Sequence, residues 1–272
     1  MTEQLGRRCA LAILAALTLA MVVGLIAWGP VLLDAAVHRY ADQRRWFGLP
    51  NALNVLASLP LLAAGVWGWH ATRTSSWPTE LRRPWQAFHV CVAGGSLIAA
   101  AYHAAPNDTG YVLAQLAMSA AFVLLTVGML AERVSARFGS HVGLAAATAL
   151  VAVMAAAVGF GVGTTGSIDL RPFLLLQLLP VLLIPAGVLS LPGRHTRSAD
   201  WMIMLVAYAV AKAFDLADTA IFSATGWISG HALMHLSLAI VAGRLAYRAA
   251  NAAVAEAADG PTQRQTSLNT AS

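Results

Sequence analysis

Eight long apolar stretches constrain the fold of this chain more than any other feature. They span roughly residues 9–33, 51–70, 86–104, 111–131, 141–160, 172–190, 200–220 and 228–249. Each is close to the ~20 residues with which an α-helix crosses ~30 Å of hydrocarbon. Lipid cannot satisfy exposed backbone polar groups, and continuous apolar runs such as Leu174–Leu183 lack the alternation of membrane barrel strands. The sequence predicts an all-α, polytopic membrane helix bundle embedded in a lipid bilayer.

The composition agrees with a membrane protein, because only 11% of the residues are charged, against about 25% in soluble domains. Arg7 and Arg8 before the first apolar stretch resemble the start of a signal peptide, but the run to Leu33 exceeds the ~7–15 residues of a signal core. We therefore expect a cytoplasmic segment at 1–8, an additional transmembrane helix at 9–33, a membrane domain at 34–250 and a disordered polar tail at 251–272.

The arginines predict the orientation of the bundle. With eight spans, twelve arginines fall on the side of the two termini and four on the other side. The positive-inside rule then places both termini in the cytoplasm. Because the arginines are dispersed over short loops, we do not expect nucleic acid as a partner. Lys212 is the only lysine among the 17 Lys and Arg residues, and this arginine usage favours a bacterial inner membrane.

Three histidines are predicted to meet at the non-cytoplasmic end. His231 and His235 are four residues apart at the start of the last stretch, so they share a helix face, and His103 closes the third stretch. In many catalytic sites three protein ligands hold the zinc ion, and its fourth coordination position is occupied by water. The alternative is that they are interfacial or core histidines that hydrogen-bond to backbone or headgroups. The common depth and the spacing favour a metal site.

Two further polar groups have alternative interpretations. Lys212, Asp215 and Asp218 lie roughly on one face of the seventh stretch. They either form an ion pair within the bundle or a functional site, in which Asp218 accepts a hydrogen bond from a ligand histidine. The second group surrounds the start of the second apolar stretch. Its polar side chains either satisfy backbone groups at that helix start and make interhelical contacts, or they form a ligand site. Its members are Asp42, Gly48, Pro50, Asn51, Asn54 and Ser58.

Five segments between Asp42 and Tyr247 carry a resemblance to a known family. They read DQRRWFGLPNALNVLASLP, YHAAPND, GSIDLRPFLLLQLLP, YAVAKAFDLADTAIF and SGHALMHL. In this order they resemble the alkaline ceramidase family, within the CREST group of membrane hydrolases. The resemblance implies a seven-helix domain over 34–250, with 9–33 as an added helix, and Zn²⁺ held by His103, His231 and His235. It also implies hydrolysis of the amide of ceramide or a related lipid to a fatty acid and a sphingoid base.

The chain departs from the family at several positions. Ala99 replaces a serine, Leu113, Ala114 and Gln115 replace a tryptophan–aspartate–arginine run, and Ala117 replaces a proline. Asp108 and Asp218 are the predicted substitutes for the missing catalytic acid. Some relatives bind Ca²⁺ near the first core helix, where Asp42 lies, but the sparse acidic residues here disfavour calcium.

Three functions are consistent with these residues. The first is a zinc-dependent ceramidase-type amidohydrolase. The second is a catalytically impaired relative that binds zinc and lipid without cleavage, which Ala99 and Ala114 suggest. The third is a transporter or receptor that uses Lys212, Asp215 and Asp218 as an ion path, but no broken-helix repeat supports it.

Overall fold

The computed structural model describes the backbone of residues 2–269 and the side chains of residues 4–252, and it confirms the all-α fold. The helices are α1 (Thr2–Trp28), α2 (Ala52–Thr74), α3 (Thr79–Ala104), α4 (Asp108–Arg133), α5 (His141–Thr165), α6 (Arg171–Ser190), α7 (Ser198–Leu216), α8 (Asp218–Thr225) and α9 (Gly230–Asn269). Two short 3₁₀ helices, η1 (Ala35–His38) and η2 (Ala136–Gly139), lie in the connections.

The predicted membrane spans correspond to these helices. Within the described residues, six helices are long and apolar enough to cross a membrane, and a seventh span results if α8 and α9 are counted as one broken segment bent by 110°. The remaining predicted span, 200–220, differs because α7 ends at Leu216 and contains Asp200, Lys212 and Asp215. The chain is therefore a polytopic helical membrane protein in which α7 is a bundle helix with three charged side chains.

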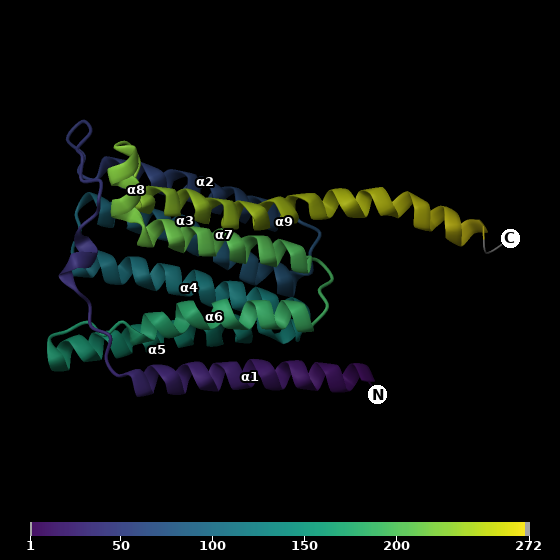
Figure 1. The fold of residues 1–272 in the computed structure, drawn as a ribbon. Coiled ribbons are helices and arrows are strands. Elements are labelled where there is room, and N and C mark those ends of the chain that lie inside the picture. Colours follow the sequence, from purple (N-terminus) through teal and green to yellow (C-terminus); the bar gives the residue numbers. More distant parts are fainter. Residues whose placement is uncertain (1, 270–272) are drawn as a thin grey trace.

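The helices surround a central space. In the bundle, α2 packs on α3 and α9, α3 packs on α4, α4 packs on α6, and α7 packs on α9 (Figure 1). Two helices lie outside: α1 packs against α6, and α5 packs against α4. The main core lies toward the end where α3 and α7 begin, and it contains Trp85, Trp201, Met129 and Leu245, all at most 2% exposed. A cavity runs from this core toward the opposite end of the bundle.

Both chain ends lie at one end of the bundle, and α8 lies at the other (Figure 1). Because α9 begins beside α8 and α3 ends at that same end, the predicted histidines lie opposite the termini. The predicted disorder of residues 251–272 stays a prediction. The backbone of α9 continues as helix to Asn269, the side chains from residue 253 onward lie outside the description, and so do residues 270–272 entirely.

Candidate metal centre and lipid cavity

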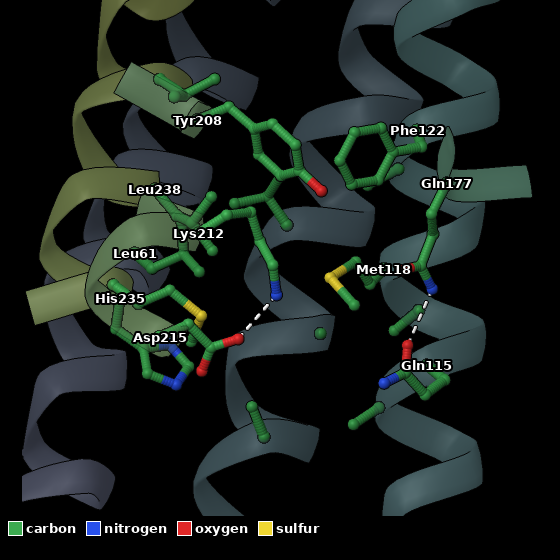
Figure 2. Close-up of a pocket in the computed structure, with 18 of the residues that line it drawn as sticks. Leu61, Gln115, Met118, Phe122, Gln177, Tyr208, Lys212, Asp215, His235 and Leu238 are labelled. Atoms are coloured by element: carbon green, nitrogen blue, oxygen red, sulfur yellow. Dashed lines mark hydrogen bonds and ion pairs between the residues drawn. The ribbon is translucent and has the colours of Figure 1, made fainter. Parts of the chain in front are cut away.

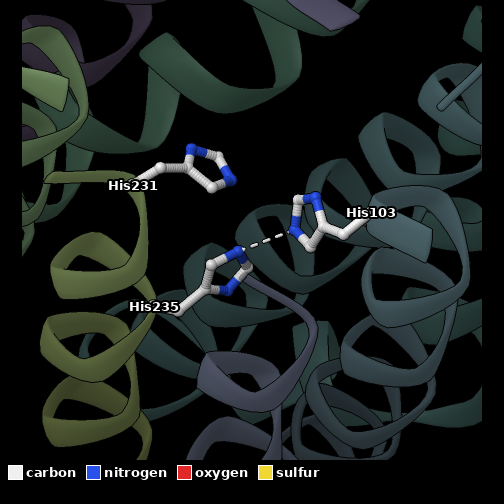
Figure 3. Close-up of side chains that lie close together, drawn as sticks. All are labelled: His103, His231 and His235. Atoms are coloured by element: carbon white, nitrogen blue, oxygen red, sulfur yellow. Dashed lines mark hydrogen bonds between the residues drawn. The ribbon is translucent and has the colours of Figure 1, made fainter. Parts of the chain in front are cut away.

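The structure brings the three predicted histidines together. His103 lies in the last turn of α3, and His231 and His235 lie on one face of the first turns of α9 (Figure 3). One ligand nitrogen from each ring lies within 4.8 Å of the other two. The Nε2 atoms of His103 and His235 are 2.9 Å apart. His103 and His235 are 3% and 5% exposed, so the cluster is largely shielded from solvent.

The cluster fits a zinc ion by its geometry and its donors. His231 Nε2 and His235 Nδ1 are buried and have no hydrogen-bond partner in the described part of the chain. An unpartnered buried nitrogen costs free energy, and a cation bound by His231 Nε2 would remove that cost at this atom. In His235 the nitrogen that faces His103 is Nε2, so Nε2 is the atom that could bind the same cation. Nitrogens bound tetrahedrally to zinc lie roughly 3.3 Å apart, which small ring rotations here would reach. Metal binding itself stays a prediction.

Two of the rings are oriented through their other nitrogen. Asp215 Oδ1 lies 2.9 Å from His231 Nδ1, and the Tyr40 hydroxyl lies 2.9 Å from His103 Nδ1. When these Nδ1 atoms carry the proton, both Nε2 atoms are free to ligate, which is the arrangement usual around protein-bound metals. Burial raises the pKa of the Tyr40 phenol, so this hydroxyl stays neutral at physiological pH.

A glycine and two capping side chains place His231. A Cβ atom on Gly230 would collide with the Phe214 carbonyl oxygen, so the absence of a side chain lets α9 start against the end of α7. Asp218 Oδ1 accepts the His231 backbone N–H at 2.8 Å, and Ser229 Oγ accepts that of Ala232 at 3.2 Å. These contacts satisfy free N–H groups of the helix start.

Asn51 fixes the other half of the site. It precedes α2 with a left-handed backbone (φ 46°) and makes no capping bond through its side chain. Its Nδ2 instead donates to the His103 carbonyl oxygen at 2.8 Å. Asn54 accepts from Ser229 Oγ at 3.2 Å, and Ser58 bonds within its own helix. Of the two interpretations of this group, the structure shows interhelical polar contacts that join α2 to the ends of α3 and α9.

The acids predicted as catalytic substitutes occupy different places. Asp218 lines the cavity, but both of its oxygens accept backbone N–H groups, from His231 and from Ala41 at 2.9 Å. Asp108 is 68% exposed and pairs with His38 at 2.8 Å. The acid that contacts a cluster imidazole is Asp215, which also accepts from Lys212 Nζ at 2.6 Å. A catalytic role for Asp108 or Asp218 stays a prediction.

Asp42 is engaged by an arginine. Its side chain is 1% exposed, and Arg44 donates to its two carboxylate oxygens at 2.8 Å and 2.7 Å. Burial alone would raise the pKa of Asp42, but hydrogen bonds from Arg44 and its positive charge lower it overall. A calcium ion at Asp42 would have to displace this guanidinium, which adds a reason to disfavour calcium there.

A cavity of about 630 Å³ opens from the histidine cluster into the bundle. Its wall is mostly apolar, with stripes from α3, α4, α6, α7 and α9. On α7 the stripe runs from Trp201 to Asp215, which corresponds to about 21 Å of helix. Met118, Phe122 and Leu238 are among the lining side chains in Figure 2. The dimensions and the apolar wall suit a long hydrocarbon chain whose end reaches the histidines.

Four of the five departures from the family pattern lie on this wall, and the fifth, Leu113, is exposed outside it. Ala99, Ala114, Gln115 and Ala117 all line the cavity. Ala99 and Ala114 therefore leave space, and place no polar group at their own positions, in the cavity that also contains the histidines. Ser96 also lines the cavity, but its hydroxyl donates to the Val92 carbonyl oxygen one turn earlier.

No protein-family model, curated protein or solved structure matches the chain. The functional interpretation therefore depends on the geometry of the histidine cluster and the cavity.

Proposed function

We propose that the chain is a zinc-dependent membrane amidohydrolase of the ceramidase type, which cleaves the amide of ceramide or a related lipid into a fatty acid and a sphingoid base. The observation that supports this proposal best is the convergence of His103, His231 and His235 at the mouth of an apolar cavity. Membrane-buried histidines are costly unless they have partners, and a cavity of this kind brings an acyl chain to them.

In this mechanism the protein binds and positions the lipid, and its second-layer residues hold the imidazoles. The apolar stripes of the cavity take the chain, and Asp215 and Tyr40 orient His231 and His103. Zinc held by the three histidines would supply the Lewis acidity that polarises an amide carbonyl and lowers the pKa of water. Lys212 lines the cavity next to Asp215, and its ammonium group would donate a hydrogen bond to an oxygen of the bound lipid.

The second candidate is a related protein that binds zinc and lipid without cleavage. It is favoured by Ala99 and Ala114 on the cavity wall, where the family has a serine and an acid. Loss of a general acid–base group typically lowers the rate by about 10²–10⁴-fold. In this case an Ala114→Asp variant gains hydrolysis that the natural protein lacks.

The proposal includes a location. The arginine-rich end, with both termini, faces the cytoplasm of a bacterial cell, and the histidine end faces the outer side of the inner membrane. The distribution of arginines supports this orientation.

Zinc stoichiometry and ceramide hydrolysis test the proposal together. Purified protein should hold about one zinc per chain, His103→Ala should lose it, and His141→Ala, at the exposed start of α5, should keep it. Wild-type protein should release fatty acid from ceramide, and His231→Ala should not. Zinc without turnover in wild type would leave the second candidate, and absence of zinc would refute both.

A further inference from the structure

A polar cluster interrupts the apolar wall of the cavity. Gln177 on α6 donates through Nε2 to Gln115 Oε1 at 2.7 Å and to Ser119 Oγ at 3.1 Å, both on α4. Ser119 is fully buried, whereas the two glutamines are partly exposed and line the cavity. In Figure 2 this pair lies across the cavity from the Lys212–Asp215 pair of α7.

The glutamine pair has hydrogen-bonding capacity to spare. The Gln115 amide can donate one N–H to the Tyr111 hydroxyl, and its second N–H and Gln177 Oε1 remain available to a ligand. A plain alkyl chain packed against them would leave a donor and an acceptor unsatisfied, which opposes its binding there. A hydroxyl group both donates and accepts, so a single hydroxyl can satisfy the two amides.

The depth of the cluster indicates which part of a ligand it meets. Gln115 follows the start of α4 at Asp108 by about 10 Å of helix, and that helix start lies beside the end of α3 that carries His103. Lys212 lies one turn deeper than Asp215 and lines the same cavity, across from the glutamines (Figure 2). A carbonyl or carboxylate oxygen near Lys212 would direct the acyl chain past Gln115 within its first carbons.

We propose that the acyl group bound in this cavity carries a hydroxyl close to its carbonyl end, and that Gln115 and Gln177 select it. The proposal rests on the proposed function for the acyl amide, and it narrows the substrate class to N-(hydroxyacyl) lipid amides. Sites built to hydrogen-bond a hydroxyl discriminate strongly against analogues that lack it.

Binding of free acids tests the selection without requiring turnover. Purified full-length protein, treated with a chelator, is titrated with 2-hydroxy-, 3-hydroxy- and unsubstituted palmitic acid in competition with a fluorescent fatty acid. We expect one hydroxylated acid to bind at least about tenfold more tightly than palmitic acid. Gln115→Met/Gln177→Met should abolish this preference, and single Gln115→Met should reduce it. Gln86→Met, the same change on α3 outside the cavity lining, should retain it.

The proposed selection is overturned if wild type binds all the acids equally or binds none of them. It is also overturned if the double variant keeps the preference. Thermal unfolding of each variant checks that it is folded. Hydrolysis of hydroxylated and unsubstituted ceramides at equal rates would overturn this inference and leave the amidohydrolase intact. A retained hydroxyl preference in a protein that hydrolyses no amide would refute the enzyme and leave the binding site.

Discussion

Asp215 is the carboxylate on which the orientation of His231 depends. It bonds to His231 Nδ1 at 2.9 Å and to Lys212 at 2.6 Å, so its position is fixed from two directions. Residues that orient a metal-ligating histidine typically contribute about 10–100-fold in metal affinity. We expect Asp215→Asn to weaken zinc binding by this factor, measured by competition with a chelator. Asp108→Asn, whose carboxylate pairs with His38 instead, should match wild type. Equal losses in both variants would contradict the role of Asp215.

The sequence could predict which histidines converge but not their partners. The four-residue spacing of His231 and His235 and the end of a span at His103 were enough to place three rings at one depth. The sequence indicated Asp218 as the hydrogen-bond acceptor for a ligand histidine. Asp218 accepts the His231 backbone N–H instead, and Asp215 accepts from the ring, because α7 stops at Leu216 and α8 changes direction. Tyr40 gave no signal, since it approaches from a loop without periodicity.

Helices α2 and α3 make close contact through a glycine. A Cβ atom on Gly68 would overlap the imidazole of His89, which is fully buried. We expect Gly68→Ala to destabilise the protein by about 1–3 kcal/mol, the usual cost of overpacking a core. Gly94→Ala, on α3 with open space at its Cβ position, should be neutral or slightly stabilising, since alanine favours helix. Thermal unfolding in detergent compares them, and equal melting temperatures would contradict the close contact.

The loop before α2 is held by an acid-sensitive ion pair. Because Arg44 lowers the pKa of Asp42 in the folded state below its ordinary value of 3.8, the pair stabilises the fold above that value. This stabilisation is lost as the pH falls through the lower folded-state pKa. Asp42→Asn should reduce stability at neutral pH by about 1–3 kcal/mol, limited by solvent screening because Arg44 is 39% exposed.

Unfolding followed from neutral to acidic pH checks this prediction. The difference in stability between wild type and Asp42→Asn should shrink as the pH approaches and passes below the pKa of Asp42. Asp34→Asn, an exposed cap of η1, serves as the control and should run parallel to wild type. A difference in stability between wild type and Asp42→Asn that stays constant with pH would contradict the ion-pair explanation.

At the scale of elements, hydropathy predicted the spans well and their breaks poorly. The apolar stretch 200–220 gives no sign that the helix ends at Leu216, because no glycine or proline occurs between that residue and Gly226. The short helix α8 ends at Gly226, which has a left-handed backbone (φ 70°), and α9 then leaves at 110°. Such a break depends on contacts with α7 and the preceding loop, which only the folded bundle supplies.

The whole molecule has two chemically different ends, and this asymmetry predicts its orientation. In a background with Cys9→Ser and Cys91→Ser, a single cysteine replaces Thr225 at the histidine end or Arg194 at the arginine-rich end. Both positions are exposed. In intact bacterial cells, an impermeant thiol reagent that reaches the periplasm should label Thr225→Cys and leave Arg194→Cys unlabelled. Lysed cells should show labelling of both, and the reverse pattern in intact cells would invert the proposed orientation.

The loop before α2, which lines the cavity through Tyr40, and the start of α9 are held by the same side chain. This has a consequence for how a lipid would enter the cavity. Asp218 holds the Ala41 backbone with one oxygen and the His231 backbone with the other, while Arg44 donates to the Gly226 and Trp227 carbonyl oxygens. Lifting the loop to admit a lipid from above would therefore disturb a histidine of the cluster. α6 and α7 both line the cavity and touch each other sparsely. If the cavity binds a lipid as proposed, entry between these two helices from the surrounding leaflet would leave the histidines in place.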